Sequence, residues 1–173
     1  MDPFATLGIA RAFDVDLAAV EKVHRELSRA LHPDRYVGAS KSERATSLAK
    51  AVEVNEAWRV VRDPIRRAEA LLALHGVAVS DGDGRAVAKA DPGFLMDMLE
   101  QREALSEAKA SKDIEAVRRM AAEIEERVRG VERALSEGFA RGEASALAGK
   151  VSELKFYRRF LDEVSAIEDE WAA

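Results

Sequence analysis

The sequence predicts an all-α protein made of two helical domains. Apolar residues recur every three or four positions along most of the chain, and no strand-like alternation interrupts this helical period. A stretch rich in Gly and Asp, residues 77–91, divides the chain in two. The charge balance also differs, with 12 Lys and Arg against 11 Asp and Glu in residues 1–75, and 15 against 21 in residues 76–173. We therefore expect an N-terminal domain over 1–76, a linker over 77–91 and a C-terminal domain over 92–173.

In the first domain, a short helix is expected over Pro3 to Leu7. Asp16 is placed to cap a second helix that runs to Leu31, because a carboxylate accepts hydrogen bonds from the first free backbone amides. This helix places one apolar stripe on a single face. The stripe consists of Val20, Val23, Leu27 and Leu31.

A loop marked by Pro33 and Gly38 follows, and helical spacing resumes near Ser42. Asp63-Pro64 begins a fourth helix, since proline fits the first helical position, and Gly76 is placed to end it. One side of the third helix is expected to face inward. That side carries Leu48, Ala51, Asn55, Trp58 and Val61.

The C-terminal domain is predicted to begin at Asp91-Pro92 and to contain three long helices. Their expected ranges are 92–110, 112–140 and 143–170, with breaks near 111–113 and 138–142. Short connections favour antiparallel neighbours, so these helices predict a three-helix bundle.

The composition narrows the classes of function. The chain has no cysteine, which excludes disulfides and thiolate chemistry. It shows no secretory signal and no apolar run long enough to span a membrane. Neither half has the basic excess typical of nucleic-acid binders. We expect a cytoplasmic protein that binds neither membrane nor nucleic acid.

The most informative motif is His32-Pro33-Asp34, which follows the basic second helix. On that helix, Lys22, Arg25 and Arg29 form one cationic stripe, separate from the apolar stripe. Such a stripe suits docking to an acidic surface, where charge steers encounter and orientation.

A histidine beside a carboxylate can act as an acid–base pair, but no nucleophile, oxyanion-hole motif or phosphate loop accompanies His32 and Asp34. The three histidines, His24, His32 and His75, have no metal-ligand spacing. We therefore expect no enzyme activity, no metal and no cofactor.

A histidine, a proline turn and a carboxylate between two helices resemble the loop of a J-domain. More specifically, the chain resembles the iron–sulfur co-chaperone family HscB, from Asp2 to about Leu161. The resemblance rests on Val54-Asn55-Glu56-Ala57-Trp58, Asp63-Pro64, Arg67-Ala68-Glu69, Leu74-His75-Gly76 and the run from Phe94 to Glu103.

This resemblance implies an L-shaped molecule in which the J-domain is docked on a three-helix bundle. It implies a co-chaperone that activates ATP hydrolysis by a specialised DnaK-type chaperone, HscA, and so promotes cluster transfer from the scaffold protein IscU. The implied chaperone-binding residues are Lys22, Arg25, Arg29, His32, Pro33, Asp34 and Arg35, the last replacing the family's usual Lys. The implied scaffold-binding residues are Leu95, Met96, Leu99, Glu100, Glu103 and Phe156.

Helical geometry gives independent support for the second surface. At about 100° per residue, Phe94, Met98 and Leu105 share one side of their helix, while a second apolar stripe with a carboxylate rim lies nearly opposite. The second stripe is either a protein-binding patch or a second buried face between the domains. A generic J-protein with another client remains the alternative function.

Overall fold

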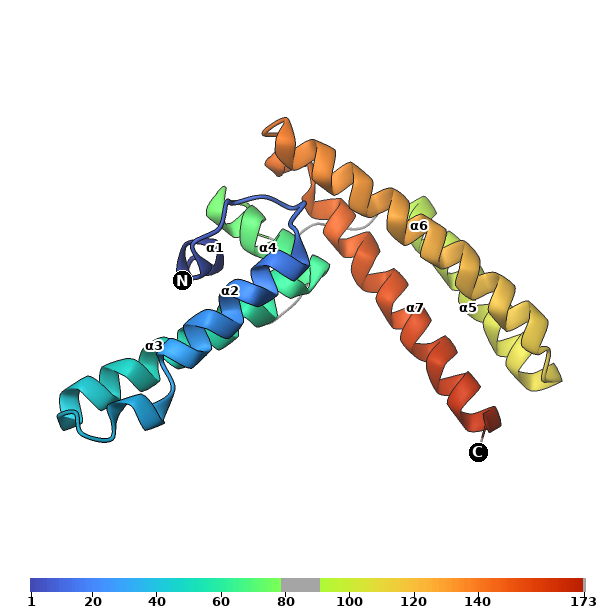
Figure 1. The fold of residues 1–173 in the computed structure, drawn as a ribbon. Coiled ribbons are helices and arrows are strands. Elements are labelled where there is room, and N and C mark those ends of the chain that lie inside the picture. Colours follow the sequence, from blue (N-terminus) through green and yellow to red (C-terminus); the bar gives the residue numbers. More distant parts are fainter. Residues whose placement is uncertain (79–90, 173) are drawn as a thin grey trace. The chain divides into compact units, whose positions relative to one another are not determined.

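The computed structural model describes residues 1–78 and 91–172, and these residues form helices without any strand. Most of the expected linker, at 79–90, lies outside the described residues. Contacts group the chain into two compact units, Met1–His75 and Gly76–Ala173. The all-α prediction is confirmed (Figure 1). The elements are α1 (Pro3–Leu7), α2 (Leu17–Ala30), η1 (Pro33–Tyr36), α3 (Lys41–Arg62), α4 (Pro64–Leu74), α5 (Pro92–Ser111), α6 (Ile114–Ala140), η2 (Ala144–Ala146) and α7 (Ala148–Ala172).

Helix starts follow the capping residues in the sequence. Asp16 accepts hydrogen bonds from the amides of Ala18 and Ala19, at 3.0 and 3.1 Å. Asp63 and Asp91 cap α4 and α5 in the same way, each immediately before a proline at the first helical position. These caps satisfy amide groups that have no partner inside the helix, so they fix where each helix begins.

In the N-terminal unit, α2 and α3 form a helical hairpin, and α1 and α4 pack against α3. The core sits where these helices meet, away from the loop that joins α2 to α3. Burial of large apolar side chains there anchors the base of the hairpin. The fully buried large side chains of this unit are Phe4, Leu7, Val61, Leu71 and Leu72.

The expected inward side of α3 is confirmed at Val61, which is fully buried, and Ala51 and Trp58 are half-buried, but the prediction was wrong by one residue at Leu48 and Asn55. Leu48 is 60% exposed and Asn55 is exposed, whereas Ser47 and Val54 are buried. Ser47 tolerates burial because its hydroxyl donates a 3.2 Å hydrogen bond to the Leu31 carbonyl. A pattern of apolar residues therefore misled the prediction, since a polar residue occupies the interior and an apolar one faces solvent.

In the C-terminal unit, α5, α6 and α7 all contact one another, as expected for a three-helix bundle. Near its C-terminal end, α6 packs closely on the segment before α7: a Cβ added at Gly138, within α6, would lie 2.6 Å from the Leu147 side chain, which would have to shift. That contact brings the end of α6 against the start of α7. The fully buried large side chains of this unit are Leu105, Val117, Ile124, Leu135, Val151 and Phe160.

Candidate functional site

The His32-Pro33-Asp34 loop stands at the tip of the α2–α3 hairpin. His32 has the extended backbone (φ −63°, ψ 135°) that the following proline favours, and so it ends α2 and caps η1. The amide of Arg35 donates a 3.0 Å hydrogen bond to the His32 carbonyl and closes the turn. The side chains of His32 and Asp34 are 59% and 86% exposed, so both are available to a partner.

The side chains of His32 and Asp34 face each other at the outer limit of hydrogen-bonding distance. Nδ1 of His32 lies 3.4 Å from the Asp34 amide nitrogen and 3.5 Å from an Asp34 carboxylate oxygen. Contacts this long between exposed groups add little to stability. The pair has no buried surroundings of the kind that tune an acid–base residue. Its geometry suits hydrogen bonding and charge pairing with another protein.

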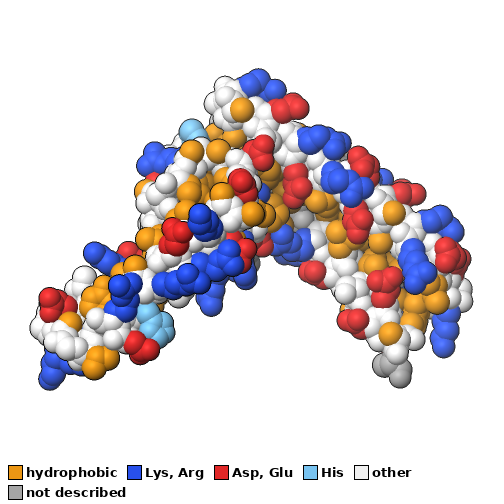
Figure 2. Space-filling model, in the orientation of Figure 1, with side chains coloured by type: hydrophobic (Ala, Val, Ile, Leu, Met, Phe, Trp, Pro, Cys, Tyr) orange, Lys and Arg blue, Asp and Glu red, His pale blue; other side chains and the backbone are white. Residues whose placement is uncertain are grey.

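The cationic stripe predicted on α2 is exposed to solvent along its length. Lys22, Arg25 and Arg29 are all exposed, and Arg25 makes only a 3.9 Å contact with Glu21. An ion pair at that distance on the surface contributes little. Figure 2 shows Lys and Arg side chains gathered over α2 and α3 in the N-terminal unit. The stripe can therefore exchange its weak internal contact for an external one.

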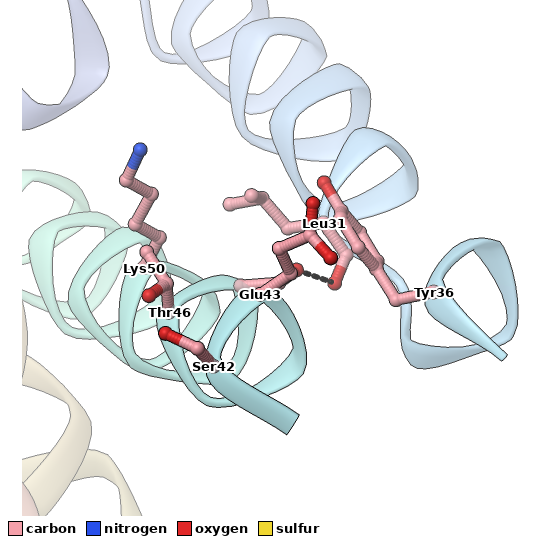
Figure 3. Close-up of a pocket in the computed structure, with 7 residues that line it drawn as sticks. Leu31, Tyr36, Ser42, Glu43, Thr46 and Lys50 are labelled. Carbon is pink, nitrogen blue, oxygen red and sulfur yellow. Dashed lines mark hydrogen bonds between the residues drawn. The ribbon is translucent and has the colours of Figure 1, made fainter. Parts of the chain in front are cut away.

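Three interactions hold the loop between the helices. The Tyr36 hydroxyl donates a 3.4 Å hydrogen bond to the Ala30 carbonyl, and the Tyr36 ring lies near Leu31 (Figure 3). Ser40 and Glu43 form a reciprocal capping box at the start of α3, with a 2.8 Å bond from the Ser40 amide to the carboxylate. Hydrogen bonds from the Ser40 hydroxyl and amide lower the pKa of Glu43.

A polar seam joins α2 to α3 in the middle of the hairpin, and sequence reasoning missed it. Nε2 of His24 lies 3.0 Å from Oδ1 of Asn55, and its ring stacks on Trp58 at 5.4 Å between centroids. The spacing of single residues does not reveal pairs that meet across two helices. These contacts help to set the orientation of α2, and with it the position of the cationic stripe, relative to α3.

The second apolar stripe on α5 lies outside the bundle core. Leu95, Met96 and Leu99 are 42%, 59% and 52% exposed, which is the exposure expected of a binding patch. On the other side of the helix, Met98 and Leu105 are 4% and 0% exposed. Glu100 and Glu103 are exposed on the same helix as the stripe and supply carboxylates.

Phe156 on α7 is half-buried and belongs to an aromatic cluster. Its ring meets Phe94 edge to face, with centroids 5.6 Å apart, and Phe94 meets Tyr157 in the same way. Nearby, the guanidinium of Arg127 is paired with Asp97, whose hydrogen bond raises the pKa of Arg127. These contacts tie α5, the helix that carries the stripe, to both α6 and α7.

Two other kinds of feature, a metal site and a membrane-spanning helix, are absent from the described part of the chain. Residues 1–78 and 91–172 contain no cluster of three or more His, Asp or Glu side chains placed to hold a metal ion. In the same ranges, no helix combines the length and apolarity that crossing a membrane requires.

An exposed His-Pro-Asp loop at the tip of a helical hairpin, joined to a helical bundle, defines a J-domain co-chaperone. A family profile described as "HSCB C-terminal oligomerisation domain" matches residues 90–165. A "Co-chaperone protein HscB homolog" of Shewanella baltica is 32% identical, over 98% of this chain and 98% of its own length. That of Aeromonas hydrophila is 32% identical over 98% and 97%.

Solved structures agree with these sequence matches. "Chaperone HscB from Vibrio cholerae" superposes with a TM-score of 0.86 at 29% identity and covers 99% of both chains. The human co-chaperone HscB also gives 0.86, at 22% identity, over 97% of this chain and 82% of that one, and supports the fold alone. The chain belongs to the HscB family of co-chaperones.

Proposed function

We propose that this chain stimulates ATP hydrolysis by a specialised DnaK-type chaperone, HscA, in iron–sulfur cluster biogenesis in the cytoplasm. The exposed loop carries the proposal, because His32 and Asp34 lie at the tip of the hairpin and take no part in the core. The cationic stripe would orient the hairpin on an acidic face of the chaperone, and Arg35 extends the positive charge beside the loop.

The C-terminal unit would bind the cluster scaffold protein, IscU, through the exposed stripe of α5. An apolar patch with a charged rim is typical of a protein interface. Leu95, Met96 and Leu99 would supply the apolar contacts, and Glu100 and Glu103 the rim. Phe156 would contribute from α7, where Phe94 fixes its ring.

The two surfaces together suggest how the protein works. One chain that holds the scaffold and also docks on the chaperone raises the local concentration of scaffold at the chaperone. ATP hydrolysis in the chaperone would then follow when its client is in reach. This chain would supply no chemistry of its own, and its relatives are named co-chaperones.

Steady-state ATPase assays with the purified chaperone test the role of the loop. The variants His32→Gln and Asp34→Asn should lose stimulation while their helicity stays that of wild type, because the loop is exposed and contributes little to folding. The control is Asp14→Asn, which removes another exposed carboxylate of the same unit. Normal stimulation by either loop variant would overturn the proposed mechanism.

Co-purification with the scaffold tests the client. Immobilised wild-type protein should retain IscU, and the variant with Leu95, Met96 and Leu99 replaced by Ala should not, since a few anchors usually dominate an interface. Failure of the wild-type protein to retain the scaffold would point instead to a J-domain co-chaperone with a different client.

A further inference from the structure

Helix α3 carries an exposed apolar face, formed by Leu48 and Val52, that belongs to neither surface described above. These side chains are 60% and 61% exposed and lie one helical turn apart. Neither packs in the core. Two large apolar side chains side by side in solvent are costly to leave uncovered and mark a contact surface more often than a scattered single residue does.

This face continues into a hollow directly beside the His-Pro-Asp loop. The hollow has a volume of about 160 Å³ and is largely apolar. It can hold one aliphatic side chain and is smaller than the roughly 300–1,000 Å³ of a small-molecule pocket. The residues that line it are Leu31, Pro33, Tyr36, Arg44, Ser47 and Leu48.

The apolar face and the cationic stripe lie on the same side of the hairpin. Asn55 and Arg59 share the exposed side of α3 with Leu48 and Val52, as their spacing of three and four residues requires. Asn55 reaches across to His24 of α2. Arg25 follows His24 on α2, so its side chain projects about 100° further round the helix axis, onto the exposed surface of α2.

The charges around the apolar face favour one kind of occupant. Arg44 and Arg59 are exposed at its edges, and Arg25 and Arg29 lie across the seam. A partner that covers this surface needs an apolar side chain flanked by carboxylates. A second copy of the same face would instead set arginines against arginines, which disfavours self-association.

We propose that the hollow beside Pro33 takes one aliphatic side chain of the DnaK-type chaperone, with Leu48 and Val52 as its apolar rim. The inference rests on the proposed function and extends it, because it adds an apolar anchor to a surface so far described by charge. Any partner that contacts Pro33 already borders the hollow. Charge would steer the encounter, and the anchor would slow dissociation.

The test titrates the co-chaperone in the chaperone ATPase assay. The variant Leu48→Gln/Val52→Gln removes the apolar face and keeps good helix formers in α3. Its half-maximal concentration should rise about tenfold, as expected for the loss of one interface anchor, while maximal stimulation at saturation stays that of wild type. The matched control, Leu74→Gln/Ile114→Gln, changes two other exposed apolar residues and should behave as wild type.

Salt separates the apolar anchor from the cationic stripe. At about 0.5 M salt ion pairs are screened, so wild type should keep residual chaperone binding that the double Gln variant lacks. Unchanged half-maximal concentration in a folded double Gln variant would overturn the anchor, even if Asp34→Asn still abolishes stimulation. Loss of self-association in that variant would assign the face to a second copy instead. Absence of stimulation by wild type would overturn the proposed function and the anchor with it.

The milder variant Leu48→Ala/Val52→Ala keeps the test decisive if the Gln variant unfolds. It shortens both side chains without adding polar groups and should raise the half-maximal concentration in the same direction. A wild-type titration curve from this folded variant would also overturn the proposal.

Discussion

The contact between His24 and Trp58 links the two long helices of the N-terminal unit at the scale of single residues. The rings are nearly parallel, at 16°, and both side chains are half-buried. A half-buried ring contributes less than a core ring, because part of its surface stays in water in the folded state.

Replacing Trp58 by Ala should therefore lower the free energy of unfolding by about 1–3 kcal/mol, below the ~3–5 kcal/mol typical of a core aromatic. Chemical denaturation followed by far-UV circular dichroism would measure it. Trp58→Phe should recover much of the loss, since a smaller ring can still stack on His24. A loss as large as that of a core ring would mean that Trp58 is more deeply packed than its exposure indicates.

Single residues were predictable where the interaction is local. Asp16, Asp63 and Gly76 act at helix ends as expected, because a cap depends on neighbours within a few positions. The pairing of His24 with Asn55 joins residues far apart in sequence. No local pattern carries such a contact, so sequence reasoning placed Asn55 on the wrong side of α3.

At the scale of one element, the start of α3 depends on the capping box of Ser40 and Glu43. The hydrogen bonds from Ser40 lower the pKa of Glu43 below its ordinary value of 4.5. A lowered pKa in the folded state means that this stabilisation is present above the unfolded-state pKa and is lost as the pH falls through the folded-state value.

The variant Glu43→Gln should thus show a shallower loss of stability than wild type when the pH falls below 4.5. Thermal unfolding of both proteins across a series of acidic buffers would measure the difference. At neutral pH the variant should be slightly less stable than wild type. Parallel curves for the two proteins throughout the acid range would show that the capping box does not form.

Helix α5 carries core residues on one side and the proposed scaffold-binding stripe on the other. Met98→Ala should cost about 2–5 kcal/mol, because the side chain is 4% exposed and its loss leaves a cavity. Replacing Leu95, Met96 and Leu99 together by Ala should change the unfolding free energy far less, since all three are exposed and Ala favours helix. Urea titration of both variants measures this. Unfolding of the triple variant at room temperature would place the stripe in the core.

At the scale of the whole molecule, helical periodicity was enough to predict the helices and the all-α class. The second apolar stripe of α5 was also predictable, because a bundle helix needs only one apolar side and this one has two, but the pattern left open whether that stripe is exposed or buried. The buried side of α3 was not, because Ser47 is buried through its hydrogen bond and Leu48 is left in solvent. Whether a residue at such a position is buried depends on its tertiary contacts, and helical periodicity in the sequence gives no information about those contacts.

The central claim is that one chain joins two surfaces that act together on a chaperone and its client. Two variants each disable one surface and leave the other intact. Asp34→Asn changes the loop and keeps the α5 stripe. The triple Ala variant of Leu95, Met96 and Leu99 changes the stripe and keeps the loop. The triple variant should still stimulate the chaperone ATPase directly but should lose the extra stimulation that added scaffold gives.

Mixing the two variants tests the claim most directly, in an ATPase assay with chaperone and scaffold both present. The account predicts that the mixture gives no more stimulation than the triple Ala variant alone, because a scaffold bound to Asp34→Asn is not linked to a working loop. Wild type under the same conditions should give the full, scaffold-dependent stimulation. Recovery of that stimulation by the mixture would contradict the claim, since the two surfaces would then work equally well on separate chains.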